Sequence, residues 1–192
     1  MNSMQHTRPP RAIITVAAEN GAILGLYLIL LAIFTGLGSS FGLATLLVWA
    51  GSIYLPFFLY RLMHAHYREA GYTLSLAELW AQGLMSFLLG SLLQAAAVYV
   101  LLRFVAPGFM ASQMQIAVDT FRALGSPQGE ALATQIETVR STLGVPTAAD
   151  IAANLIVFNI LCGAVIGLAD AIILTVRHRS RTRRGNGSQT PQ

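Results

Sequence analysis

Asp170 is the residue whose type and position are best suited to chemistry, because it stands inside the apolar run 151–176. It lies about seven residues, or roughly 10 Å of helix rise, before the first arginine that follows this run. A carboxyl group at that depth in lipid is costly, so it must face other helices or water. At about 100° per residue, the same helix face carries Asn159, Gly163 and Gly167. These residues predict a polar, glycine-bearing stripe.

A matching stripe of Ser86, Gly90 and Gln94 lies in the apolar run that precedes it in the chain. The two runs are expected to cross the membrane in opposite directions, so residues at equal depth can be paired by counting. Gln94 should lie near Asn159, and Ser86 near Asp170. Such contacts are worth about 0.6 to 2 kcal/mol each in a membrane. The polar groups either hold the helices together or form a path for protons or cations.

The first apolar run contains the small-xxx-small pair Gly21 and Gly25, beside Glu19. This pair is typical of close helix packing, either against the helix that carries Asp170 or against a second copy of the chain. Glu19 stands at a depth similar to that of Asp170, and two such acids could share a proton. Glu19 projects away from the glycine face, however, so its default position is among the lipid headgroups.

Metal and enzyme chemistry have weak support in this sequence. His64, His66 and Glu69 are close together, but histidines two residues apart point in different directions on a helix, and we predict no metal site. Cys162 is interpreted as a packing residue within an apolar run. Phosphate-binding loops, serine nucleophile motifs and nucleotide fingerprints are missing from the sequence, so we expect no enzymatic activity and no cofactor.

Composition assigns the chain to the membrane. Of its 192 residues, 55% are hydrophobic and 10% charged, and the stretch 21–60 contains no charged side chain. An all-α, polytopic fold with the bilayer as partner follows. Four transmembrane helices are predicted over about 17–37, with a possible start near 12, and over 41–60, 76–105 and 151–176.

The segment 106–150 has a different pattern from these runs. Apolar residues recur there at spacings of three and four, with charged residues between them, in two stretches too short to cross a membrane. They predict an extracytoplasmic amphipathic helical hairpin between helices three and four, lying on the membrane or over the bundle. The termini, 1–11 and 177–192, are predicted to be disordered.

Orientation follows from the arginines, which are the only Lys or Arg residues present. With both termini in the cytoplasm, nine of them lie inside and three, Arg103, Arg122 and Arg140, lie outside. This asymmetry favours a multi-pass protein with its N-terminus and C-terminus on the cytoplasmic side of the membrane. The arginine-rich C-terminal tail should bind anionic lipid rather than nucleic acid.

Several features together resemble a known family. They are Tyr72 to Leu76, Gly83, the FVAPGF sequence at 104–109, the amphipathic insertion, and a glycine-bearing last helix with a basic end at Arg177. In this order they are similar to bacterial membrane proteins grouped as domain of unknown function 4199. The resemblance implies a four-helix inner-membrane protein with a helical insertion before the last span, and it implies no activity, cofactor or functional residue.

The sequence favours a structural, accessory or interaction protein without enzymatic activity. Its glycine-lined faces would then join it to a second copy or to another membrane protein. The alternative is a small proton- or cation-coupled transporter or channel component that uses Asp170.

Overall fold

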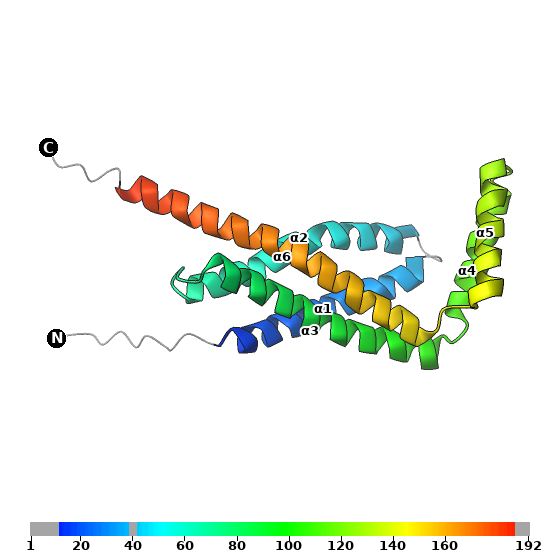
Figure 1. Ribbon diagram of the computed structural model, residues 1–192, viewed down its shortest axis with the longest axis horizontal. Coiled ribbons are helices and arrows are strands. Elements are labelled where there is room, and N and C mark those ends of the chain that lie inside the picture. Colours follow the sequence, from blue (N-terminus) through cyan, green and yellow to red (C-terminus); the bar gives the residue numbers. More distant parts are fainter. Residues whose placement is uncertain (1–11, 39–41, 187–192) are drawn as a thin grey trace. The chain divides into compact units, whose positions relative to one another are not determined.

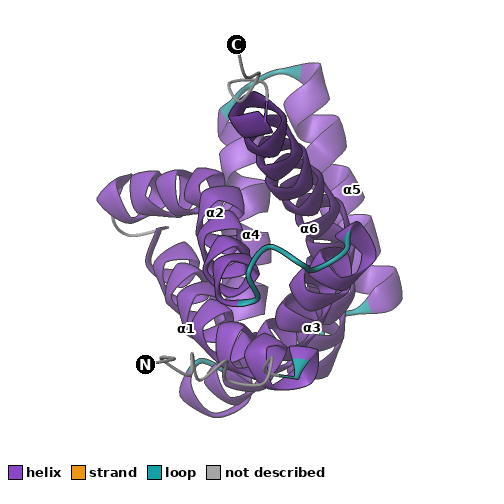
Figure 2. Ribbon diagram, turned by 90° about the vertical axis from the view of Figure 1, so that its left-hand side faces the viewer, coloured by secondary structure: helices purple, strands orange, loops and turns teal. Residues whose placement is uncertain are grey.

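The computed structural model describes residues 12–38 and 42–186, which form helices joined by short loops and contain no strand (Figures 1 and 2). The α-helices are α1 (Ile13–Gly38), α2 (Gly42–Glu69), α3 (Leu76–Val100), α4 (Phe109–Ala123), α5 (Pro127–Leu143) and α6 (Ala148–Asn186), and a π-helical turn, η1 (Leu101–Val105), extends α3. The predictions made for 1–11 and for 187–192 lie outside the described residues.

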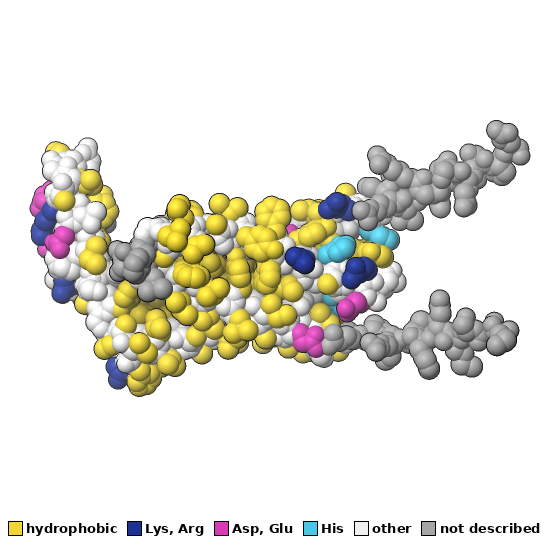
Figure 3. Space-filling view, turned by 180° about the vertical axis from the view of Figure 1, so that it is seen from behind, with side chains coloured by type: hydrophobic (Ala, Val, Ile, Leu, Met, Phe, Trp, Pro, Cys, Tyr) yellow, Lys and Arg dark blue, Asp and Glu magenta, His cyan; other side chains and the backbone are white. Residues whose placement is uncertain are grey.

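Four helices are long and apolar enough to cross a membrane, as expected for a multi-pass membrane protein. The spans are Ile13–Gly36, Gly42–Glu69, Leu76–Val105 and Ala148–His178. Hydrophobic side chains cover the surface of these helices between their ends, and Arg and His side chains gather at the end where α1 begins (Figure 3). The described end of α6 lies at that same end (Figure 1).

Two predicted helix ends were wrong. The second helix does not stop near residue 60 but continues to Glu69, because Leu59, Met63 and Tyr67 extend its buried stripe at four-residue spacing. Arg61 and Arg68 lie on the exposed side of the same turns, so the charges do not oppose the helix. The last helix continues past residue 176 to Asn186, where we had expected disorder. Arginine is a good helix former, which allows this continuation.

Two of the long helices, α3 and α6, begin with a capping box. Before α3, the backbone N–H of Ser75 donates to Glu78 Oε2 at 2.7 Å, and that of Glu78 donates to Ser75 Oγ at 3.3 Å. Before α6, Thr147 and Asp150 form the same reciprocal pair, at 2.9 and 3.2 Å. Each box satisfies two N–H groups that a helix start leaves without partners, and so fixes where the helix begins.

The chain comprises two compact units. One contains α1, α2, α3 up to Gln94 and α6 from Ile156, and the other runs from Ala95 to Leu155. In the first unit, α1 packs against α3 through glycines. A Cβ added to Gly21 would lie 2.8 Å from Leu89 Cβ, and one added to Gly90 would lie 3.1 Å from the Gly21 carbonyl oxygen. The expectation that Gly21 and Gly25 face the last helix or a second copy was therefore wrong.

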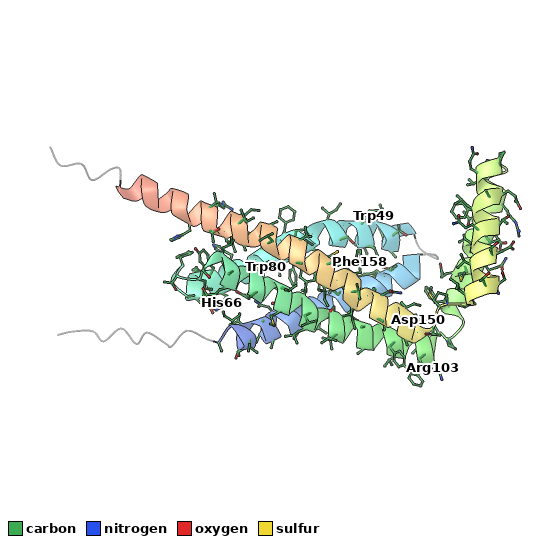
Figure 4. All side chains as sticks on the ribbon, viewed as in Figure 1. Trp49, His66, Trp80, Arg103, Asp150 and Phe158 are labelled. Carbon is green, nitrogen blue, oxygen red and sulfur yellow. The ribbon has the colours of Figure 1, made fainter. Side chains whose placement is uncertain are left out.

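The contact between α3 and α6 also depends on glycine. A Cβ on Gly83 would lie 3.2 Å from Gly167 Cα, and one on Gly163 would overlap the side chain of Phe87. Near this crossing, Trp80 Nε1 donates to the Ala164 carbonyl oxygen at 3.0 Å (Figure 4). The small residues let the two helix backbones approach closely, which is how membrane helices gain packing energy.

In the second unit, α4 and α5 form the predicted helical hairpin. Ser126 caps α5 by accepting from the N–H of Gly129 at 3.1 Å, with Pro127 as the first helical residue. Arg122 of α4 donates to Glu137 of α5 at 2.8 Å, and this contact raises the pKa of Arg122. Arg140 Nη1 donates to Gln115 Oε1 at 3.1 Å, so the two helices run antiparallel.

A candidate polar site inside the helix bundle

Gln94 joins three helices of the bundle through two hydrogen bonds. Its Oε1 accepts from Asn159 Nδ2 of α6 at 2.6 Å, and its Nε2 donates to the Leu28 carbonyl oxygen of α1 at 3.2 Å. Both side chains are buried. Gln94, Asn159 and the Leu28 carbonyl are called the Gln94 cluster below. The structure thus brings together the first pair that counting along the stripes predicted.

Asp170 is buried in α6 and has a polar atom without a partner. Its residue surface is 5% exposed, and its Oδ2 accepts no hydrogen bond from the described residues. Because α6 runs antiparallel to α3 and Gly167 packs on Gly83, the next turn of α6 comes level with the residues that precede Gly83. This register places Asp170 at the level of Gln82.

Gln82 is fully buried in α3 and contacts α2. Its Oε1 lies 2.9 Å from Nδ1 of His66, which is also buried, near the end of the bundle where α2 leads into α3 (Figure 4). The Nε2 of Gln82 has no hydrogen-bond partner among the described residues. Gln82 therefore presents one satisfied and one unsatisfied polar atom inside the bundle.

Asn20 adds a buried amide from α1. Its Nδ2 likewise has no partner among the described residues. The adjacent Gly21 packs on α3 beside the Ser86 carbonyl oxygen, about one turn along α3 from Gln82. We call Asn20, His66, Gln82 and Asp170 the Asp170 site; each of the four spanning helices contributes one of its residues.

The three unpartnered atoms of this site are chemically complementary. In the described part of the chain, the buried side-chain atoms without a partner are Asn20 Nδ2, Gln82 Nε2 and Asp170 Oδ2. Two are amide donors and one is a carboxyl oxygen. Buried polar groups in proteins are nearly always satisfied, so three orphans from three helices in one bundle require an explanation.

Two predicted site residues do not join Asp170. The hydroxyl of Ser86 is buried, but it donates its hydrogen bond to the Gln82 carbonyl oxygen at 2.8 Å, one turn earlier in the same helix. The predicted pairing of Ser86 with Asp170 is therefore not formed. Glu19 has an exposed side chain, unlike Asp170, so it is not a second buried acid of this site.

Sequence reasoning did not assign His66 or Gln82 to this site, although each had a signal. Gln82 precedes Ser86 by four residues and so extends the stripe that leads to Gln94. His66 follows Leu59 by seven residues and belongs to the buried stripe of α2. Among the described residues, no group of three or more His, Cys, Asp or Glu side chains is arranged to hold a metal ion.

Comparison with known proteins identifies the family of this chain. The family model described as "Protein of unknown function (DUF4199)" matches residues 19–175. The chain belongs to this family. The matched part includes all four residues of the Asp170 site and the whole α4–α5 hairpin. Comparisons with curated proteins and with solved structures find no match.

Proposed function

We propose that this member of the DUF4199 family is a non-enzymatic membrane protein in which Asp170 takes up and releases a proton, as a component of a transporter or channel. The observation that carries the proposal is the unsatisfied state of the site: Asp170 Oδ2 is buried without a partner, while two buried amide donors on other helices also have none. A carboxyl group kept only for packing would be expected to use such donors, because each unsatisfied group is costly in lipid.

The chemistry of the site favours a proton over a metal cation. Hard cations need several oxygen ligands, whereas the unpartnered groups on α1 and α3 are N–H donors. N–H donors stabilise the ionised form of a carboxyl group, whereas burial stabilises its protonated form. Asp170 is thus suited to alternate between the two forms.

His66 provides a route between Asp170 and the arginine-bearing end of the bundle. It contacts Gln82 at 2.9 Å, and its neighbour Tyr67 lines a pocket at that end. Histidine is the side chain that most readily exchanges a proton near neutral pH. In this proposal a proton moves between His66 and Asp170 through water, because the side-chain amide of Gln82 holds His66 but does not itself carry a proton.

Proton flux into proteoliposomes tests the proposal. The full chain should carry flux under an imposed pH gradient, Asp170→Asn should reduce it to the level of empty vesicles, and Asp170→Glu should retain part of it. Glu19→Gln is the matched control, because it neutralises an exposed acid of the same bundle and should leave flux unchanged. Equal flux in the wild type and Asp170→Asn would refute the proposal.

A structural or accessory role is the second candidate, and α2 supplies its support. The most apolar stretch of α2 is 11% buried, compared with 28 to 39% for the other spans. Ile53 and Phe57 are among its exposed side chains. This surface suits the helix of another membrane protein. The glycines named for oligomerisation are used within the chain, so α2 takes their place in this hypothesis. Photo-crosslinking from Ile53, with Leu161 of α6 as the comparison site, should then capture one defined protein.

We further propose a bacterial inner-membrane location with both termini in the cytoplasm and the α4–α5 hairpin outside. The arginine asymmetry supports this orientation. Replacing Cys162, the single cysteine, by serine allows new cysteines to be placed one at a time. An impermeant thiol reagent added to intact cells should label Thr134→Cys in the hairpin and not Arg68→Cys.

A further inference from the structure

A pocket of about 410 Å³ lies at the end of the bundle where Arg and His side chains gather (Figure 3). It is formed by the last turns of α2, the loop that follows, and α6 near residues 174–178. Its described lining consists of tyrosine, histidine and arginine side chains above Leu174, and includes no acidic residue. The volume is within the usual range for small-molecule sites, and the chemistry suits an anion.

One wall of the pocket contains a permanently charged side chain, Arg177. Arg177 Nη1 donates to the Tyr60 hydroxyl at 3.2 Å, which fixes the guanidinium at the pocket. A guanidinium has five N–H donors, so further donors remain for a ligand. The ring of His64 stacks on that of Tyr60 with centroids 5.9 Å apart, and adds a ring nitrogen to the same wall.

Another part of the pocket lining is an aromatic cluster that includes a residue with an unusual backbone conformation. Tyr72 has a backbone φ of +63°, the same value as Gly71 before it. Residues other than glycine rarely adopt this left-handed region. The N–H of Tyr72 donates to the Tyr67 carbonyl oxygen at 2.9 Å. The Tyr72 ring then stacks on His178 with centroids 4.7 Å apart and meets Tyr67 edge-on at 5.2 Å. Backbone strain of this kind is retained where packing or function requires it.

The position of the pocket identifies the source of the anion. It lies where the apolar spans end, since α2 ends at Glu69 and the last span at His178. Tyrosine and arginine at this level meet lipid headgroups. Leu174 beneath them is buried and apolar. A phosphate attached to a glycerol and acyl chains would place its charge near Arg177 and its apolar part beside the bundle.

The geometry points to a binding site for the phosphate of an anionic phospholipid headgroup, with Arg177 as its principal donor. This site is built from residues far apart in the sequence and differs from diffuse attraction by the arginine-rich tail. It does not depend on proton exchange at Asp170. Free phosphate shares the recognised chemistry, so the test includes it.

Native mass spectrometry of the purified full chain in neutral detergent measures this binding. Titration with phosphatidylglycerol should give one tightly held lipid, and phosphatidylcholine should bind more weakly. Arg177→Gln should weaken phosphatidylglycerol binding about tenfold, the loss expected for a charge-assisted hydrogen bond. Arg61→Gln removes an exposed arginine of α2 that does not line the pocket, and it should bind as the wild type does.

A second pair of variants tests the site without changing Arg177, in case Arg177→Gln fails to fold. Tyr60→Phe removes the hydroxyl that holds Arg177 and should also weaken binding, whereas Tyr54→Phe, on the exposed face, should not. Equal losses in the Arg177 and Arg61 variants, or in the Tyr60 and Tyr54 variants, would overturn the site. Displacement of the lipid by equimolar glycerol phosphate or inorganic phosphate would show that the ligand is a soluble phosphate and overturn the lipid assignment.

Discussion

The Gln94 cluster and the Asp170 site are both polar, both buried and built largely on the same helices, yet they differ in how completely they are satisfied. Gln94 uses its oxygen on α6 and its nitrogen on α1. Asp170, Gln82 and Asn20 each retain a buried polar atom with no partner in the described residues. In lipid, a satisfied amide bridge stabilises the fold, whereas an unsatisfied carboxyl group destabilises it. The first region therefore has the properties of a structural bridge, and the second contains the unsatisfied polar atoms on which the proposed proton exchange depends.

The largest effect should come from removing the carboxyl group altogether. Asp170→Leu should raise the free energy of unfolding, by up to about 3 kcal/mol, because a buried polar group without a partner destabilises the folded state by about 1 to 3 kcal/mol relative to an unfolded chain that can hydrate it. Thermal or steric-trap unfolding in detergent measures it, with exposed Gln128→Leu in α5 as the control. A loss of stability as large as this gain would mean that Asp170 is satisfied in the folded protein, and the contrast with Gln94 would disappear.

Gly163 lies between the two regions on α6 and tests whether one helix contact supports both. A methyl group there would overlap Phe87, so Gly163→Ala should destabilise the bundle by about 2 kcal/mol through overpacking. Gly42→Ala is the matched control, because nothing lies within 4 Å of a Cβ at that position. Equal unfolding free energies for the two variants would exclude the close α3–α6 contact.

Gln94→Leu should lower the free energy of unfolding, whereas Asp170→Leu should raise it. It leaves Asn159 Nδ2 and the Leu28 carbonyl oxygen without their partner, at a cost of about 1 kcal/mol. Proton flux measured on the same preparation should remain that of the wild type. Loss of flux without loss of stability would assign chemistry to Gln94 and make the two regions equivalent.

The smallest effect is the coupling between the regions. Gln94 and Asn159 should show a coupling energy of about 0.6 kcal/mol in a double-mutant cycle. Asn159 and Asp170 are eleven residues apart on α6, or roughly 16 Å along it, so Gln94→Leu and Asp170→Asn should be additive within about 0.5 kcal/mol. A larger coupling would join the two regions into one network.

The sequence predicted the four spans because each is a continuous apolar run, and it predicted the Gln94 contact because polar residues recur on one face of each helix. Counting along two antiparallel stripes was sufficient to place Gln94 beside Asn159. It was not sufficient for the inner pair, since the Ser86 hydroxyl bonds its own helix and Gln82 occupies the level of Asp170. The partner of Gly21 and Gly25 was also missed, because a small-xxx-small motif specifies a close contact but not which helix makes it. His66 was considered only as a metal ligand and was not placed in the bundle, because α2 was expected to end before it.

The central claim is that Asp170 exchanges a proton while buried in the bundle, and infrared difference spectroscopy of the reconstituted full chain tests it most directly. A step in pH should produce a carbonyl stretching band of a protonated carboxyl group in an apolar setting, and this band should be missing from the difference spectrum of Asp170→Asn. The same band at full strength in Asp170→Asn, or no such band in the wild type across the titration of carboxyl groups, would contradict the account.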